Sequence, residues 1–126
     1  YITMQKEIMP LRNYAHIGDA VWEVFVRDYT ILQTSNSKLL HKITTDRVKA
    51  SFQKDMLEYI LPDLTEEEQE LARRGRNLPI PVARRSIQHE YRPATAFEVL
   101  IGFWYLHDKD RLNYFWNKFK QTEFFS

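Results

Sequence analysis

The sequence has no cysteine, and it has few residues that interrupt helices, with 3 glycines and 5 prolines. The lack of cysteine excludes disulfides, thiolate metal sites and a cysteine nucleophile. No apolar run approaches the roughly 20 residues that a membrane span requires, and the first ten residues lack the basic-then-apolar order of a signal peptide. We therefore expect no membrane contact and a cytoplasmic protein. An organellar origin stays open, because the chain opens with Tyr1 rather than Met and a targeting segment ahead of it would be missing.

The composition is sufficient for one compact core. The chain has 126 residues, of which 44% are hydrophobic and 14% aromatic. This length supports one domain over residues 1–126 and is too short for two cores. The net charge of +1 argues neither for nor against a polyanionic partner, so only the placement of the charges is informative.

Apolar residues recur at spacings of three and four, which predicts an all-α fold. We predict helices over about 11–32 and 38–60, a third helix that begins at the Thr65–Glu68 capping box, and two more over about 93–107 and 108–121. The polar stretch 34–37 separates the first two helices, and 77–91 is expected to be an exposed loop followed by Pro93 at a helix start. The first helix is expected to bury Leu11, Ile17, Val21, Val24, Phe25 and Leu32.

Two acids stand among apolar neighbours inside predicted helices, namely Asp19 and Glu98. Burying an ionised carboxylate costs several kcal/mol unless a cation or several donors compensate it. An ion pair with an arginine, or a helix face turned to water, would explain either acid alone. Two such acids also suit a hard divalent cation such as Mg²⁺, which takes few protein carboxylates. Gly18 and Gly102 would let the two helices approach closely near these acids.

A third acid, Glu23, lies one turn after Asp19. It could act behind the metal ligands, but the Glu-before-Arg spacing to Arg27 favours a salt bridge. The four histidines show no pair at metal-ligand spacing, and the sequence contains neither a phosphate-binding glycine loop nor a Gly-x-Ser-x-Gly motif. Metal-assisted chemistry is what remains.

Positive charge is concentrated between Arg73 and Arg92, where six arginines accompany the single acid Glu90. A guanidinium group can bind two phosphate oxygens at once, so this segment suits a nucleic-acid backbone. A solvated surface loop would explain the same cluster of arginines. A second polar and basic set around His41 and Lys42 allows the same two interpretations. Because few aromatic residues are interleaved with these charges, a duplex is favoured over single-stranded bases.

The motifs around the two acids resemble those of a known family. The segment 14–23, YAHIGDAVWE, looks like the signature helix of ribonuclease III enzymes, and 95–102, TAFEVLIG, looks like their second acidic motif. Further segments, LHK at 40–42, VKA at 48–50 and RRGRN at 73–77, are similar to Mini-ribonuclease III, which has the catalytic domain without a double-stranded-RNA-binding domain.

This resemblance implies a helical homodimer that uses Mg²⁺, with Mn²⁺ as a possible substitute, to process double-stranded RNA, most often precursor of large ribosomal RNA. Asp19 and Glu98 would then bind the metal and catalyse hydrolysis. Longer ribonuclease III enzymes carry two more acids, where this chain has Ala15 and Thr95, and Mini-ribonucleases III share this reduction. The residues that would bind RNA are Arg73, Arg74, Arg76, Asn77, Arg84, Arg85, His41 and Lys42.

The alternative from another class is a ribonuclease III-like module that binds structured RNA without cutting it. The two retained acids argue against that alternative, because a non-catalytic module has no physical need for carboxylates among apolar residues.

Overall fold

A computed structural model describes residues 6–126 and contains only helices and connecting segments over that range. The elements are α1 (Leu11–Thr30), α2 (Ser37–Val48), α3 (Ala50–Ile60), η1 (Leu61–Asp63), α4 (Glu66–Arg76), η2 (Val82–Ile87), α5 (Gln88–His107), α6 (Lys109–Lys120) and η3 (Glu123–Phe125). The all-α fold is therefore confirmed. Within the described range, no helix is both long enough and apolar enough to cross a membrane.

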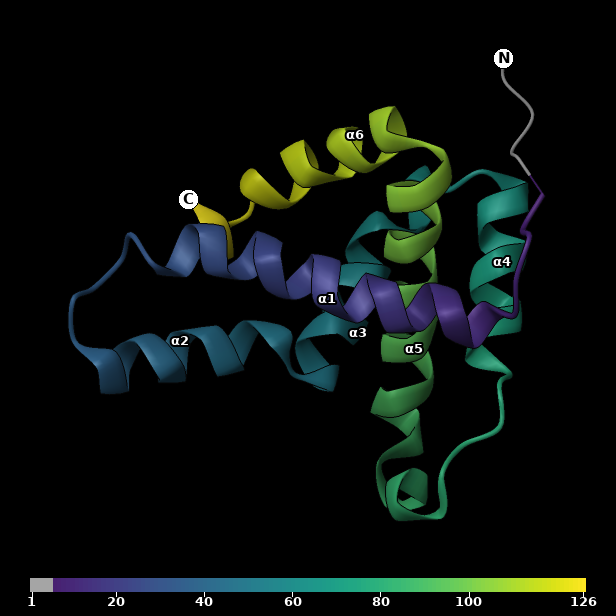
Figure 1. The fold of residues 1–126 in the computed structure, drawn as a ribbon, viewed down its shortest axis with the longest axis horizontal. Helices are drawn as coiled ribbons and strands as arrows, with labels where there is room; N and C mark the ends of the chain where they lie inside the picture. The colour runs from purple at the N-terminus through teal and green to yellow at the C-terminus, as the bar shows by residue number, and fades with distance from the viewer. Residues whose placement is uncertain (1–5) are drawn as a thin grey trace.

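Helix α5 is the centre of the fold. Figure 1 shows α1 crossing α5, with α2 running beside α1 and α6 on the other side of α1. Helices α3 and α4 also pack against α5. From Pro93 to Trp104 nearly every residue of α5 is buried, and Glu98 is the exception.

The crossing of α1 and α5 depends on two glycines. A Cβ atom on Gly18 would overlap the backbone carbonyl of Glu98, and one on Gly102 would overlap the carbonyl of Tyr14. Each glycine thus lies against the backbone of the other helix, as the sequence suggested. No larger residue fits at this separation.

The buried face of α1 differs from the predicted one. Leu11 and Phe25 are buried as expected, but Val24 is 61% exposed and Leu32, beyond the end of the helix, is 81% exposed. The buried line instead runs through Tyr14, Trp22, Val26 and Thr30. The large aromatic side chains decide the rotation of the helix, because Trp22 packs against rings from α3, α5 and α6.

The predicted helix 38–60 is two helices. The helix is interrupted at Lys49, whose backbone is extended with a ψ of 159°. The indole N–H of Trp22 donates a hydrogen bond to the carbonyl of Arg47 at 2.8 Å, so this carbonyl is held by a contact from outside the helix. The side chain of Asn36 caps α2 by accepting from the Leu39 N–H at 2.9 Å, as the polar stretch predicted.

The predicted capping box at Thr65 and Glu68 is present at the start of α4. Glu68 is only 4% exposed and also accepts hydrogen bonds from Arg111 and from the indole of Trp104. Burial by itself raises the pKa of Glu68, but these donors outweigh it and the net pKa is lowered. This acid is a structural anchor between α4, α5 and α6.

The start of α5 was predicted too late. The helix begins at Gln88, and Pro93 lies inside it. The segment expected to be an open loop contains the short helix η2, and only residues 77–81 connect it to α4. The arginines of η2 are therefore carried on ordered backbone.

Replacing Gly18 by Ala should lower the free energy of unfolding by at least about 2 kcal/mol, because its Cβ would push apart two backbones that have no flexible atoms to yield. Gly75→Ala is the matched control. Its Cβ would lie 3.1 Å from a methyl group of Val99, which is a milder approach. Urea denaturation of both variants measures the difference, and an equal effect would contradict the proposed role of the α1–α5 contact.

Candidate active site

Asp19 and Glu98 meet where α1 crosses α5. Gly18 touches the backbone of Glu98, so the residue that follows it on α1 is held next to the Glu98 side chain. The two carboxyl groups are close enough to share a hydrogen bond. The crossing thus brings together two acids that are 79 positions apart in the sequence.

The two acids differ in their surroundings. Asp19 is exposed, so the expectation that it sits in apolar surroundings is wrong, whereas Glu98 is largely buried. Burial and the negative charge of Asp19 raise the pKa of Glu98 to about 8. Near neutral pH the Glu98 carboxyl is therefore protonated in the metal-free protein.

A third side chain, Gln53, completes the inner side of the site. It lies on α3 and is only 2% exposed. Its amide Nε2 donates a hydrogen bond to Oε2 of Glu98 at 3.3 Å. Gln53 could not be identified from the sequence, because a single glutamine on an amphipathic helix gives no signal of burial.

The donor set suits a divalent cation that needs few protein ligands. Among residues 6–126, no group of three or more His, Cys, Asp or Glu side chains converges on one point. Two carboxylates and a hydrogen-bonded amide are what the site offers. Mg²⁺ commonly binds through one or two carboxylates and fills its other positions with water or substrate oxygens, so the residues fit this ion.

The basic residues predicted from the sequence fall into two groups. Arg73 pairs with Glu70 at 2.6 Å, Arg74 pairs with Glu7, and Lys42 pairs with Asp46 at 2.8 Å. Within the described part of the chain, no such ion pair occurs for the other predicted residues, which are all exposed, namely Arg76, Asn77, Arg84, Arg85 and His41. The predicted pair of Glu23 with Arg27 is present at 3.2 Å.

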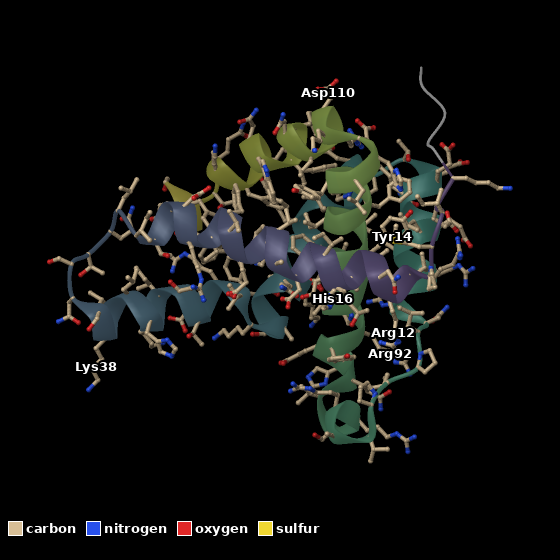
Figure 2. The ribbon with its side chains drawn as sticks, in the orientation of Figure 1. Arg12, Tyr14, His16, Lys38, Arg92 and Asp110 are labelled. Atoms are coloured by element: carbon tan, nitrogen blue, oxygen red, sulfur yellow. The ribbon has the colours of Figure 1, made fainter. Side chains whose placement is uncertain are left out.

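Two further arginines lie beside the site. Arg12 of α1 and Arg92 of α5 border a small hollow together with Arg76 and Thr95, and Figure 2 shows Arg12 and Arg92 near the α1–α5 crossing. Arg92 donates to the carbonyl of Arg76 at 3.0 Å, and Arg12 donates to that of Pro79. These contacts attach the end of α4 to α5 and the 77–81 connection to α1, the two helices that carry the acids. Arg12 was missed because it stands alone in the sequence.

Comparison with known proteins gives one consistent family. The sequence profile of the ribonuclease III domain matches residues 12–109. Mini-ribonuclease 3 of Gloeobacter violaceus is 42% identical over 109 residues, which cover 86% of this chain and 81% of the relative. Mini-ribonuclease 3 of a Synechococcus species is 37% identical over 94% of this chain and 86% of its own length.

A solved structure agrees with these relatives in fold. A crystal structure of a protein from Fusobacterium nucleatum superposes with a TM-score of 0.76 at 32% identity. The match covers 86% of this chain and 90% of that protein.

The raised pKa of Glu98 predicts how the stability of the metal-free protein depends on pH. Because the folded pKa is about 8 against 4.5 for the free group, this contribution is fully present below pH 4.5 and is lost as the pH rises towards 8. Compared with Glu98→Gln, the wild type should lose roughly 1 to 4 kcal/mol of unfolding free energy across that window. Urea denaturation in EDTA measures the difference, and equal slopes would contradict it.

Proposed function

Because the chain belongs to the ribonuclease III family, within the Mini-ribonuclease 3 group, it is an endoribonuclease, and we propose that it cuts double-stranded RNA in a magnesium-dependent reaction at Asp19 and Glu98. The observation that carries this proposal is the pair of carboxylates that face each other where α1 crosses α5. Mn²⁺, which shares the preference for oxygen ligands, is expected to substitute.

The finer substrate assignment rests on the family resemblance. We propose precursor of large ribosomal RNA, met in the cytoplasm, as the physiological duplex. The duplex would be identified by its shape and backbone rather than by base sequence.

Each residue of the site has a separate task in this proposal. A bound divalent cation would supply an activated water and stabilise negative charge on the phosphodiester. Glu98 accepts a hydrogen bond from Gln53 and would hold the cation as an ionised carboxylate. Asp19 is exposed and offers its carboxylate on the side from which RNA can approach.

We propose that the RNA backbone lies along the arginines that begin at this site. Arg76 borders the hollow next to Thr95, one turn before Glu98, and Arg84 and Arg85 continue the positive charge on η2. Guanidinium groups without a carboxylate partner are free to bind phosphate oxygens. Asn77 and His41 are exposed and can assist, while Arg73, Arg74 and Lys42 would first have to leave their acidic partners.

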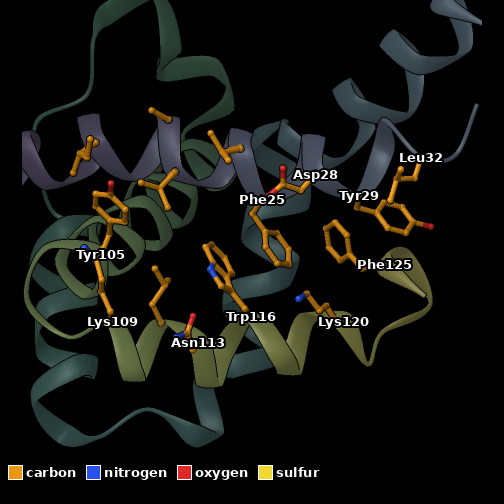
Figure 3. Close-up of a pocket in the computed structure, with 15 residues that line it drawn as sticks. Phe25, Asp28, Tyr29, Leu32, Tyr105, Lys109, Asn113, Trp116, Lys120 and Phe125 are labelled. Carbon is orange, nitrogen blue, oxygen red and sulfur yellow. The ribbon is translucent and has the colours of Figure 1, made fainter. Parts of the chain in front are cut away.

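We also propose that the enzyme is a homodimer that pairs through the apolar groove between α1 and α6. Figure 3 shows this groove, of about 740 Å³, with Phe25, Trp116 and Phe125 along its wall. Asp28 stands on one side, and Lys109 and Lys120 stand on the other. A two-fold axis would place each acid opposite the partner's lysines.

Sedimentation equilibrium should give twice the chain mass, and a monomer at assay concentrations would contradict the proposed dimer.

A non-cutting RNA-binding module is the alternative. It would use the same arginines and would not require a metal. The juxtaposition of Asp19 with Glu98 favours the enzyme, because a module that only binds RNA has no use for two carboxyl groups at one point, whereas a divalent cation is commonly bound by one or two of them.

Asp19→Asn and Glu98→Gln should each lower cleavage of labelled double-stranded RNA in Mg²⁺ by at least about 1000-fold, because each removes ligand charge with little change in volume. Binding of the duplex should remain. Asp110→Asn removes an acid on α6, away from the crossing, and should cut like the wild type. Tight binding without cutting by the wild type, on precursor ribosomal RNA and on generic duplex, would support the binding module instead.

Replacing Arg84 and Arg85 together by Ala should flatten the salt dependence of RNA binding. Removing one cation that neutralises a phosphate lowers the slope of log K against log salt by about 0.7 to 0.9. Arg73→Ala is the matched control, since its guanidinium already pairs with Glu70. Filter binding over a range of salt concentrations measures the slopes. An unchanged slope in the double variant would show that η2 does not bind phosphate.

A further inference from the structure

The buried face of α3 contains one polar side chain. Its buried residues are Phe52, Gln53, Met56, Leu57 and Ile60. A leucine or methionine would fill the position of Gln53 without the cost of removing an amide from water, which is roughly 1 to 3 kcal/mol when no hydrogen bond compensates it. Packing alone therefore gives no reason for a glutamine there.

The amide also contributes little to holding the fold together. Its hydrogen bond to Glu98 spans 3.3 Å, which is long for an N–H···O bond, and it joins the amide to a group whose pKa is raised to about 8. Two other buried polar side chains differ from Gln53 in this respect. Thr30 hydrogen-bonds to Thr44, and Glu68 accepts hydrogen bonds from Arg111 and Trp104. These partners connect helices and do not belong to the candidate active site. The partner of Gln53 is a residue of the active site.

The contact lies where it can orient a metal ligand. Glu98 projects from α5, and α3 packs directly on α5, so the amide reaches the carboxylate from the protein interior while Asp19 faces it from α1. An N–H on one carboxylate oxygen restricts rotation of the group and favours its ionised form. Both effects strengthen the binding of a cation by a carboxylate.

We propose that Gln53 is a positioning residue that orients Glu98 for binding of the divalent cation. This inference rests on the metal site proposed above and adds α3 to it. Groups that hydrogen-bond to metal ligands typically account for a factor of about 10 to 100 in metal affinity. The amide would act through Glu98 and would not touch RNA.

The test is binding of Mn²⁺ to the free enzyme, followed by the decrease in the electron paramagnetic resonance signal of the aqueous ion, with thermal unfolding in EDTA as the fold control. Gln53→Met keeps length and volume but removes the donor, and Mn²⁺ binding should weaken at least about 10-fold with no fall in Tm. Gln53→Asn keeps an amide but shortens the side chain by one methylene, so it should also bind Mn²⁺ more weakly. Gln69→Met is the matched control, because the amide of Gln69 on α4 donates at the same 3.3 Å to the carbonyl of Leu64, between η1 and α4, rather than to either acid.

The outcomes separate this inference from the metal site itself. Weaker Mn²⁺ binding by both Gln53 variants, with Gln69→Met unchanged, supports the proposal. If the wild type binds Mn²⁺ and Asp19→Asn does not, while Gln53→Met binds like the wild type, Gln53 has no positioning role and the metal site stands. If the wild type binds no Mn²⁺, the metal proposal fails first. Loss of the folded state in both Gln53 variants would make the residue structural and would overturn the inference.

Discussion

The direct backbone contact between α1 and α5 is the constraint from which the rest of the structure follows. Gly18 and Gly102 each lie against a carbonyl of the opposite helix, so the two helices approach more closely than any side chain would permit. This approach buries the middle of α5 and fixes where each helix points. It also places Asp19 beside Glu98, because Asp19 follows the glycine that touches the Glu98 backbone. The same backbone contact therefore packs the core and brings the two acids of the candidate active site together.

Two largely buried glutamates on neighbouring helices show how the protein separates stability from function. Glu68 is almost completely buried, yet its pKa is lowered, since donors from Arg111, Thr65 and Trp104 outweigh the cost of burial. The pKa of Glu98 is raised by burial and by the neighbouring Asp19, and the amide of Gln53 offsets this only in part. The charge of Glu68 is thus compensated within the folded protein. Glu98 has no such positively charged partner among residues 6–126, and a divalent cation would supply one.

On α1 as well, different side chains serve the core and the candidate active site. Its aromatic side chains turn into the core, and this rotation leaves Val24 outside, on the groove shared with α6. Asp19 is exposed by the same rotation. One helix therefore serves the core, the active site and the proposed dimer contact on different faces, and a change in its rotation would disturb all three.

Local periodicity and residue type were enough to predict the helical class, the two acids, the capping box at Thr65 and the glycines at the crossing. The break at Lys49 could not be predicted from local pattern, since a long-range contact from Trp22 holds the carbonyl of Arg47. The rotation of α1 about its own axis could not be predicted either. The helix has two apolar faces, and only packing against aromatic rings from distant parts of the sequence selects the one that is buried. Gln53 and Arg12 became visible in the tertiary structure alone. Each is an ordinary residue until the fold places it beside Glu98 or beside Arg92.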